Sequence, residues 1–467
     1  MTLTFLLNGE SVELLNVDPT TTALDWLRET RGLTGTKEGC NEGDCGACTV
    51  LLTDETGTRA VNACLLFLPQ LHGKALRTVE GLKGPKGELH PVQESMVAHH
   101  GSQCGFCTPG FIAQMAANHL NGETDHEAGL AGNLCRCTGY APILRAARAA
   151  ETAPVPAWIK DDPAFILAEI SRGEPQAGGS APLGALQPRT TDELATLYAA
   201  HPSATLVGGA TDVGLWVTKQ FRPLSELIFL AGVRDLQTIE ETATEIRIGA
   251  GVTIAALIPL MQSHHPSFAA MLTRYASPQI RAVATIGGNI ANGSPIGDGP
   301  PPLIALGATL HLRHGEKRRS LPLEDFFLDY GKQDRAPGEF VEAITIQKQP
   351  DHLKVWKISK RQDQDISAVL GAFNVAVENG TVTAARIAFG GMAGTPKRAR
   401  SVEAALLGQS WSEATVRAAA AQFAEDYQPL SDLRASATYR LRTAEALLLR
   451  AFAESQGQVT DIREVRA

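Results

Sequence analysis

The alternation of apolar and polar residues predicts a β-hairpin at the start of the chain. Residues 2–7 and 10–15 both alternate, which is the pattern of half-buried strands. Between them, Asn8-Gly9 supplies the two positive-φ residues that a tight hairpin turn requires. The chain is therefore expected to begin with two antiparallel strands.

Helical patterns follow, first in a short segment and then over residues 79–150. Thr22 is expected to cap a helix that ends near Gly32, with an apolar face at Ala23, Leu24, Trp26 and Leu27. Within 79–150, the stretches PVQESMVAHHG, TPGFIAQMAANHL and TGYAPILRAARAA predict three helices. Two of them open with Thr followed by Pro or Gly, a favourable helix entry.

The pattern changes again after residue 150. Residues 151–188 are rich in Pro, Gly, Ala and Ser around one short helical piece, FILAEI, and are read as a linker. Residues 189–349 mix strand-like and helical segments with many glycines. Beyond them, Asn379-Gly380 marks a second hairpin, and Ala-, Leu- and Arg-rich helices finish the chain.

Length, composition and charge limit the possible classes of protein. The 467 residues suggest roughly three or four domains. The hydrophobic content is 44%, and no apolar run approaches the roughly 18 residues of a membrane span. The N-terminus lacks the pattern of a signal peptide, so a cytoplasmic protein is expected. The net charge of −8 and the lack of a basic patch argue against nucleic acid as a partner.

All eight cysteines lie in the first 137 residues, so their chemistry belongs to the N-terminal third. The spacing Cys40-x4-Cys45-x2-Cys48, with Cys64 further on, is that of a plant-type [2Fe–2S] loop. The interspersed glycines would let the backbone curl around a cluster. A disulfide framework or a zinc site is the weaker alternative, because disulfides are rare in the cytoplasm and zinc knuckles lack this glycine-rich core.

The second set, Cys104-x2-Cys107 and Cys135-x-Cys137, is less specific, because two close pairs also suit zinc. Each pair runs into a Thr and a predicted helix start, in CTPGF and CTGYA. Helix N-terminal amides would then face an anionic thiolate cluster.

Two glycine pairs, in LVGGATDVG and TIGGN, follow apolar strand-like runs and could present successive amides to phosphate. A single glycine pair is more often a turn. The nearest Rossmann candidate, GAGVTI, lacks the third glycine, and no P-loop occurs, so any nucleotide would be held by another fold.

The cysteine motifs resemble those of the molybdenum hydroxylases. QCGFCTPG and GNLCRCTGY are similar to the second [2Fe–2S] motif of that family, and CNEGDCGACTV to the first, although Asp44 stands where many members have Gly. The resemblance implies two [2Fe–2S] clusters, each on four cysteines, and places Gln103 towards the pterin. The expected ligands are Cys40, Cys45, Cys48 and Cys64 for one cluster and Cys104, Cys107, Cys135 and Cys137 for the other.

The glycine loops, with SPIGD after them, resemble the FAD-binding domain of the same family and of related vanillyl-alcohol-oxidase-type flavoproteins. The resemblance implies that both loops wrap the pyrophosphate, that Asp298 bonds the flavin nucleotide, and that Tyr275 and Lys357 lie near the cofactor. The alternative is a purely structural role, with Tyr275 as a packed aromatic residue and Asp298 as a turn residue. The loop residues concerned are Leu206, Val207, Gly208, Gly209, Ala210, Thr211, Asp212 and Val213 in the first loop, and Thr285, Ile286, Gly287, Gly288 and Asn289 in the second.

Taken together, these features predict a multidomain α+β protein. We expect a β-grasp, ferredoxin-like [2Fe–2S] domain at 1–78, an all-α helical [2Fe–2S] domain at 79–150 and a linker at 151–188. An α+β FAD-binding domain at 189–349 and a C-terminal α+β flavoprotein domain with a small antiparallel sheet at 350–467 complete the chain. IAFGGMAGTPKRA (387–399) extends the resemblance into this last domain.

The resemblance implies the iron–sulfur and FAD subunit of a two-subunit bacterial xanthine dehydrogenase, because full-length relatives continue into a molybdopterin-binding region. Electrons would pass from molybdopterin on a partner subunit, through the clusters and FAD, to NAD as hypoxanthine or xanthine is oxidised to urate. The family implies two copies of each subunit, with no catalytic acid or base on this chain. The choice between NAD and oxygen as the electron acceptor stays open, because the sequence contains no readable nicotinamide-binding motif.

Two other functions remain open. The chain could serve an aldehyde or other heterocycle hydroxylase, or it could be a zinc-bearing scaffold without redox chemistry. The pairs His99-His100 and His264-His265 also suggest metal ligands, but adjacent side chains rarely face the same point, so a surface or structural role is expected.

Overall fold

The computed structural model describes residues 2–162 and 185–461, and the chain forms two compact units. The first unit contains Met1–Pro188, Ser203–Gly232 and Ala276–Ala284, and the second contains Arg189–Pro202, Val233–Tyr275 and Thr285–Ala467. The predicted domain 189–349 therefore contributes to both units. No helix among the described residues has the length and apolarity needed to cross a membrane.

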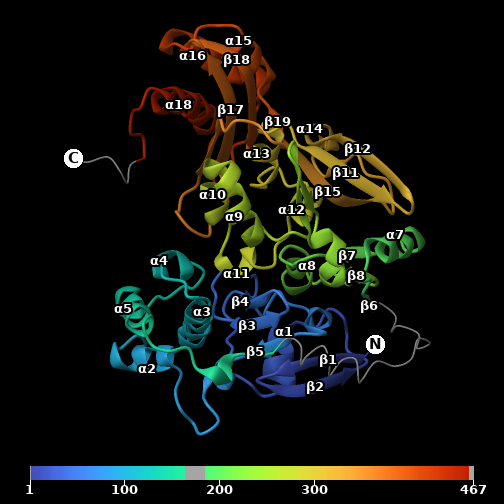
Figure 1. The fold of residues 1–467 in the computed structure, drawn as a ribbon, viewed down its shortest axis with the longest axis vertical. Coiled ribbons are helices and arrows are strands. Elements are labelled where there is room, and N and C mark those ends of the chain that lie inside the picture. The colour runs from blue at the N-terminus through green and yellow to red at the C-terminus, as the bar shows by residue number, and fades with distance from the viewer. Residues whose placement is uncertain (1, 163–184, 462–467) are drawn as a thin grey trace. The chain divides into compact units, whose positions relative to one another are not determined.

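The first unit begins with a five-stranded sheet of order β2-β1-β5-β3-β4 (Figure 1). Asn8 and Gly9 join β1 to β2 with φ values of 53° and 88°, which confirms the predicted hairpin. Thr22 caps the first helix by accepting a hydrogen bond from the Asp25 amide at 3.1 Å, as predicted. The elements are β1 Thr2–Leu7, β2 Glu10–Leu15, α1 Ala23–Asp25 continued by the π-helix Trp26–Thr30, β3 Thr49–Asp54, β4 Gly57–Asn62 and β5 Ala75–Arg77.

A group of helices lies beside this sheet (Figure 1). Helix α3 packs against β3 and β4, and it ends at Gly122, whose φ of 69° provides the left-handed residue common after helices. Its residues from Gly110 to His119 are all buried, so the helix forms the centre of this group. The helices are α2 Pro91–Ala98, α3 Thr108–Asn121, α4 His126–Gly129 and α5 Ala141–Ala150, where three were predicted.

A small parallel sheet of order β6-β8-β7 completes the first unit. Strand β6 uses residues 185–186, so the predicted linker 151–188 ends in a strand. Within the first part of that linker, Asp161 pairs with Arg77 at 2.6 Å. The FILAEI segment lies outside the described residues. The elements are β6 Ala185–Leu186, β7 Thr205–Val207, α8 Val213–Thr218, β8 Leu227–Phe229 and α11 Pro278–Arg281.

The second unit contains a five-stranded antiparallel sheet of order β12-β11-β15-β10-β9. Its central strand, β15, is buried over seven of its eight residues. Helices flank this part of the unit. The elements are α7 Thr191–Ala200, β9 Ile239–Glu241, β10 Glu245–Gly249, α9 Ile254–His264, α10 Pro266–Thr273, α12 Ile286–Asn292, α13 Pro300–Ala305, β11 Thr309–His314, β12 Lys317–Pro322, α14 Leu323–Phe326 and β15 Phe340–Gln347, with a small hairpin of β13 Phe327–Asp329 and β14 Lys332–Gln333.

A four-stranded antiparallel sheet, β16-β17-β18-β19, and the terminal helices form the rest of the second unit. Asn379 and Gly380 turn β17 into β18 with φ values of 50° and 77°, again as predicted. Phe389 lies at the centre of an aromatic core, with its ring 5.4 Å from Phe373 and 5.3 Å from Phe423. The elements are β16 Leu353–Ile358, β17 Val369–Glu378, β18 Thr381–Gly390, β19 Lys397–Arg398, α15 Arg400–Leu406, α16 Glu413–Ala420, α17 Phe423–Asp426 and α18 Ala437–Ser455.

Candidate cofactor sites

The first cysteine set lies on the loop before β3 and at the end of the β3–β4 hairpin. Backbone amides point at its sulfur atoms: the Asp44 and Cys45 amides each donate to Cys40 Sγ at 3.3 Å, and the Cys40 amide donates to Cys45 Sγ at 3.4 Å. Such amides stabilise a thiolate more than a thiol. A methyl group on Gly39 would lie 2.8 Å from Cys45 Sγ, so the tight loop requires glycine there.

The thiols of this set interact in two pairs. A hydrogen bond from the Cys45 thiol, together with backbone amides, lowers the pKa of Cys40 to about 5, and donating that bond raises the pKa of Cys45. A hydrogen bond with the Cys48 thiol, together with burial, raises the pKa of Cys64. The structure therefore brings all four sequence-predicted cysteines together, as Cys40 with Cys45 and Cys48 with Cys64.

The second set is also paired. Cys104 Sγ and Cys137 Sγ lie 3.4 Å apart at the surface. Burial and a hydrogen bond with the Cys135 thiol raise the pKa of Cys107 to about 12. By contrast, the Cys104 amide and the Thr138 hydroxyl lower the pKa of Cys137 to about 6.

This arrangement fits the thiolate requirement of [2Fe–2S] clusters. Four cysteines hold such a cluster, two on each iron, so two pairs are the set of donors that it needs. Within residues 2–162 and 185–461, no three or more His, Cys, Asp or Glu side chains are grouped to hold a single metal ion. Each set is instead a pair of pairs, and amides support the sulfur atoms of the first set.

The first glycine loop joins β7 to α8 in the first unit. A methyl group on Gly209 would lie 2.0 Å from the Val283 carbonyl oxygen, so only glycine fits there. Ala210 has a positive φ of 59°, and burial raises the pKa of the nearby Asp212 carboxyl. In the described part of the chain, the amides of residues 208–211 donate to no backbone or side-chain acceptor. Successive unengaged amides of this kind can bind a phosphate.

The second glycine loop opens helix α12 in the second unit, and its amides are already engaged. The Ile286 and Gly287 amides donate to the carbonyls of Val252 and Ala250, both at 2.9 Å. The Gly288 amide donates to Thr285 Oγ1 at 3.1 Å, and the Asn289 amide to the Thr285 carbonyl at 3.0 Å. A methyl group on Gly287 would lie 2.5 Å from Ala250 Cβ, so close packing accounts for this glycine.

Asn289 links two other predicted positions of the second unit. Its side-chain amide donates to the Tyr275 hydroxyl at 3.1 Å, and its carbonyl oxygen accepts from the Gly299 amide at 3.1 Å. Tyr275 is half-buried. Asn289 thereby connects Tyr275 to the turn that contains Asp298.

Asp298 and Lys357 form a buried ion pair, with Lys357 Nζ 2.7 Å from Asp298 Oδ2. Their side chains are 8% and 2% exposed. The other carboxylate oxygen of Asp298 accepts from the Ser367 hydroxyl at 2.5 Å. Sequence reasoning proposed the first two residues separately and missed Ser367, which no local motif marks.

The adjacent residues His264 and His265 have different partners. His264 Nε2 lies 3.0 Å from Glu241, whereas His265 Nδ1 lies 3.0 Å from Asp351, so the two rings face different partners.

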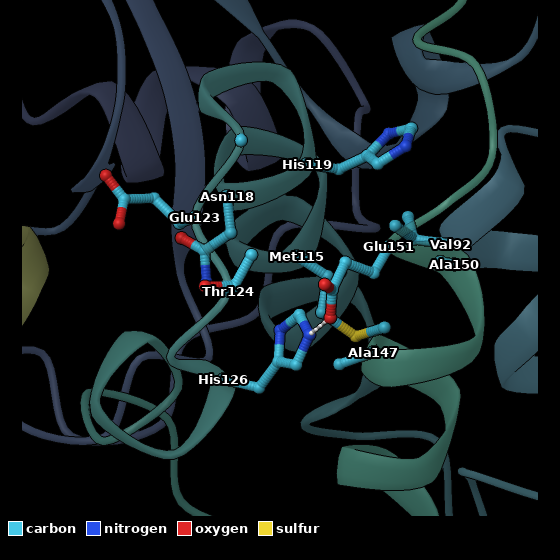
Figure 2. Close-up of a pocket in the computed structure, with 11 residues that line it drawn as sticks. Val92, Met115, Asn118, His119, Glu123, Thr124, His126, Ala147, Ala150 and Glu151 are labelled. Carbon is cyan, nitrogen blue, oxygen red and sulfur yellow. Dashed lines mark hydrogen bonds and ion pairs between the residues drawn. The ribbon is translucent and has the colours of Figure 1, made fainter.

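A separate cavity of about 170 Å³ lies among the helices of the first unit (Figure 2). His126 Nε2 bonds Glu151 at 2.9 Å across it, and the buried side chains of Asn118 and His119 line it. None of the eight cysteines lines this cavity, so it is distinct from the two thiol sets.

Four family models match successive parts of the chain. They are the 2Fe-2S iron-sulfur cluster binding domain (residues 5–68), the [2Fe-2S] binding domain (78–148), the FAD binding domain in molybdopterin dehydrogenase (181–348) and the CO dehydrogenase flavoprotein C-terminal domain (354–455). The chain therefore has two [2Fe–2S] domains and an FAD-binding domain.

Two curated relatives match most of the chain. The xanthine dehydrogenase of Drosophila subobscura is 35% identical over 84% of this chain, and the xanthine dehydrogenase/oxidase of Gallus gallus is 31% identical over 88%. These matches cover 34% and 37% of the two relatives, so the chain spans about a third of their length.

Two solved structures also match. CO dehydrogenase from Oligotropha carboxidovorans is 26% identical with a TM-score of 0.55, covering 60% of this chain and 100% of that one. Quinoline 2-oxidoreductase from Pseudomonas putida 86 is 25% identical with a TM-score of 0.55, covering 60% of this chain and 99% of that one.

Proposed function

The chain belongs to the molybdenum hydroxylase family, as its iron–sulfur and FAD portion, and from that premise we propose that it is the electron-transfer subunit of a xanthine dehydrogenase. Electrons from a molybdopterin site on a partner subunit would pass through two [2Fe–2S] clusters to FAD and then to NAD while hypoxanthine or xanthine is oxidised to urate. The observation that carries this proposal is the division of eight cysteines into two sets, each made of two thiol pairs.

The clusters and FAD supply the electron-carrying chemistry, and the chain's own residues bind and tune these groups. In the first set, the Asp44 and Cys45 amides that point at Cys40 Sγ would stabilise negative charge on the sulfur. In the second, the exposure of Cys104 and Cys137 would leave that cluster near the protein surface, where a partner subunit could approach. The β-grasp and helical subdomains assigned to residues 1–78 and 79–150 form part of this proposal.

For FAD, we assign the pyrophosphate to the first glycine loop. The amides of residues 208–211 are unengaged within the described part of the chain, whereas Ile286 to Asn289 already donate elsewhere. The glycines of the second loop serve close packing within the second unit, and we propose that this loop contacts the cofactor through Asn289 rather than by donating amides to phosphate. Asp298, held by Lys357 and Ser367, would bond the flavin nucleotide.

The relatives named xanthine dehydrogenase support xanthine, a purine, as the substrate. NAD as the acceptor is part of our proposal. The same family premise implies a cytoplasmic complex containing two copies each of this chain and a molybdopterin subunit. A second candidate changes only the substrate, to an aldehyde or other heterocycle. The likeness to quinoline 2-oxidoreductase favours this alternative.

Chemical analysis of the purified chain tests the electron-transfer proposal. Roughly four irons, two distinguishable [2Fe–2S] signals in electron paramagnetic resonance (EPR) and one FAD per chain are expected. Zinc in either cysteine set, or no flavin, would contradict it. Comparing xanthine with aldehydes and quinoline as substrates of the reconstituted complex then decides between the two candidates.

A further inference from the structure

The two cysteine loops meet at three glycines of the first unit. A methyl group on Gly46, the residue after Cys45, would lie 2.3 Å from the Gly132 carbonyl oxygen. A methyl group on Gly110, three residues after Cys107, would lie 2.2 Å from the Gly46 carbonyl oxygen. The backbones around the two thiol sets therefore touch where side chains are absent.

A direct hydrogen bond joins the two loops at this junction. The amide of Leu134, which precedes Cys135, donates to the carbonyl of Cys45 at 3.0 Å. One cysteine of each set is thus within one residue of the same hydrogen bond. Small movements at this junction would change the separation of the two sets.

A buried polar network closes the junction. Asn133 Nδ2 donates to the Gly46 carbonyl at 2.9 Å and to Thr49 Oγ1 at 3.2 Å. Thr49 Oγ1 in turn donates to the Gly46 carbonyl at 2.6 Å. Both side chains are almost fully buried, so their hydrogen bonds do not compete with water.

Gln279 enters this network from a distant part of the sequence. Its side chain is fully buried, and its Nε2 donates to Asn133 Oδ1 at 2.9 Å and to Thr49 Oγ1 at 3.3 Å. Its carbonyl oxygen has no hydrogen-bond donor in the described structure and packs on Gly132, where a methyl group would lie 1.8 Å from it. A buried unsatisfied carbonyl is costly, and a leucine or methionine at this position would avoid that cost.

We propose that Gln279 is a positioning residue that fixes the spacing between the two iron–sulfur sites, and thereby the transfer of electrons between them. Its amide holds Asn133 of the second loop and Thr49 of the first, on either side of the Cys45–Leu134 hydrogen bond. The inference rests on the proposed iron–sulfur function, since it concerns clusters bound by these cysteines.

The test is Gln279→Met in the full chain, which keeps the length of the side chain and removes its hydrogen bonds. The matched control is Gln114→Met. Gln114 is also buried in the first unit, but it donates to Asn118 at 2.8 Å and not to the cysteine loops. The readouts are iron content and the distribution of spin–spin distances between the reduced clusters, measured by pulsed EPR.

We expect Gln279→Met to keep both clusters but to broaden the distance distribution and slow inter-cluster electron transfer, with neither change in Gln114→Met. An unchanged distribution in a fully loaded Gln279→Met protein overturns the inference and leaves the electron-transfer function intact. A wild-type chain without iron overturns that function, and this inference with it. If Gln279→Met does not fold, Gln279→Leu decides, because it removes the same two hydrogen bonds and leaves those of Thr49 with Gly46 and Asn133 in place.

Discussion

The ammonium group of Lys357 lies 2.7 Å from Asp298, and both side chains are buried in the second unit. Removing one member of such a pair leaves an uncompensated buried charge. Ser367 bonds the opposite carboxylate oxygen, so the aspartate is held on both sides. This geometry gives the pair a structural role in addition to the proposed contact with flavin.

Replacing Lys357 with methionine should therefore lower the free energy of unfolding by about 3–5 kcal/mol, the usual cost of breaking a buried ion pair. Denaturant unfolding followed by circular dichroism measures the change, and released flavin reports whether the cofactor site loosens with it. Lys354→Met is the control, because Lys354 is exposed on the same strand. The double variant Lys357→Met/Asp298→Asn should recover part of the loss, since no charge is then left buried. Equal stability of Lys357→Met and the control Lys354→Met would rule out a structural role for the ion pair.

Local features of the fold were predictable because neighbouring residues determine them. The Asn8-Gly9 and Asn379-Gly380 turns and the Thr22 cap each depend on a few adjacent residues, and all three were confirmed. The cysteine spacings are equally local within each motif.

Features that depend on distant residues were not predictable. Ser367 and Asp298 are 69 residues apart, and Gln279 and Thr49 are 230 apart, so no window of sequence relates them. The backbone hydrogen bonds of the second glycine loop also depend on residues distant in the sequence. The amides of Ile286 and Gly287 donate to the carbonyls of Val252 and Ala250, which lie on another segment.

The contrast between the glycine loops predicts different effects of the same substitution. Gly209→Ala places a methyl group 2.0 Å from the Val283 carbonyl and should displace the unengaged amides, so most of the FAD should be lost on purification. Gly288→Ala meets only Thr285 Oγ1 within 4 Å, at 2.9 Å, and should retain more FAD. Flavin absorbance per chain measures both, with iron content as the check on folding. Greater flavin loss in Gly288→Ala would assign the pyrophosphate to the second loop instead.

His90 should make the helical part of the first unit sensitive to acid. Burial and the nearby charge of His119 lower the pKa of His90 to about 4, below the roughly 6.5 of an unfolded histidine. Because the unfolded chain then binds the proton more tightly, the free energy of unfolding is highest above about pH 6.5 and falls as the pH drops towards 4.

The variant His90→Asn distinguishes the effect of histidine titration from the effect of losing the helix cap. His90 Nδ1 accepts from the Val92 amide at 3.3 Å, and asparagine can replace it as a cap without titrating. Urea unfolding at about pH 7 and about pH 5 should show a smaller loss of stability in His90→Asn than in the wild type. The same loss in both proteins would mean that another group is responsible.

The pairing of thiols predicts which cysteine substitutions act alike. Cys40 and Cys45 belong to one set, so Cys40→Ser and Cys45→Ser should each remove the same EPR signal and about two of the roughly four irons. Cys107→Ser, in the other set, should remove the second signal and spare the first. Loss of both signals in all three variants would show that the sets are not independent sites, and unchanged iron in Cys45→Ser would contradict its assignment as a ligand. If Cys40→Ser and Cys45→Ser lose one signal and Cys107→Ser loses the other, the first set is a separate cluster site. This holds even though its loop touches the second loop at Gly46 and Gly132.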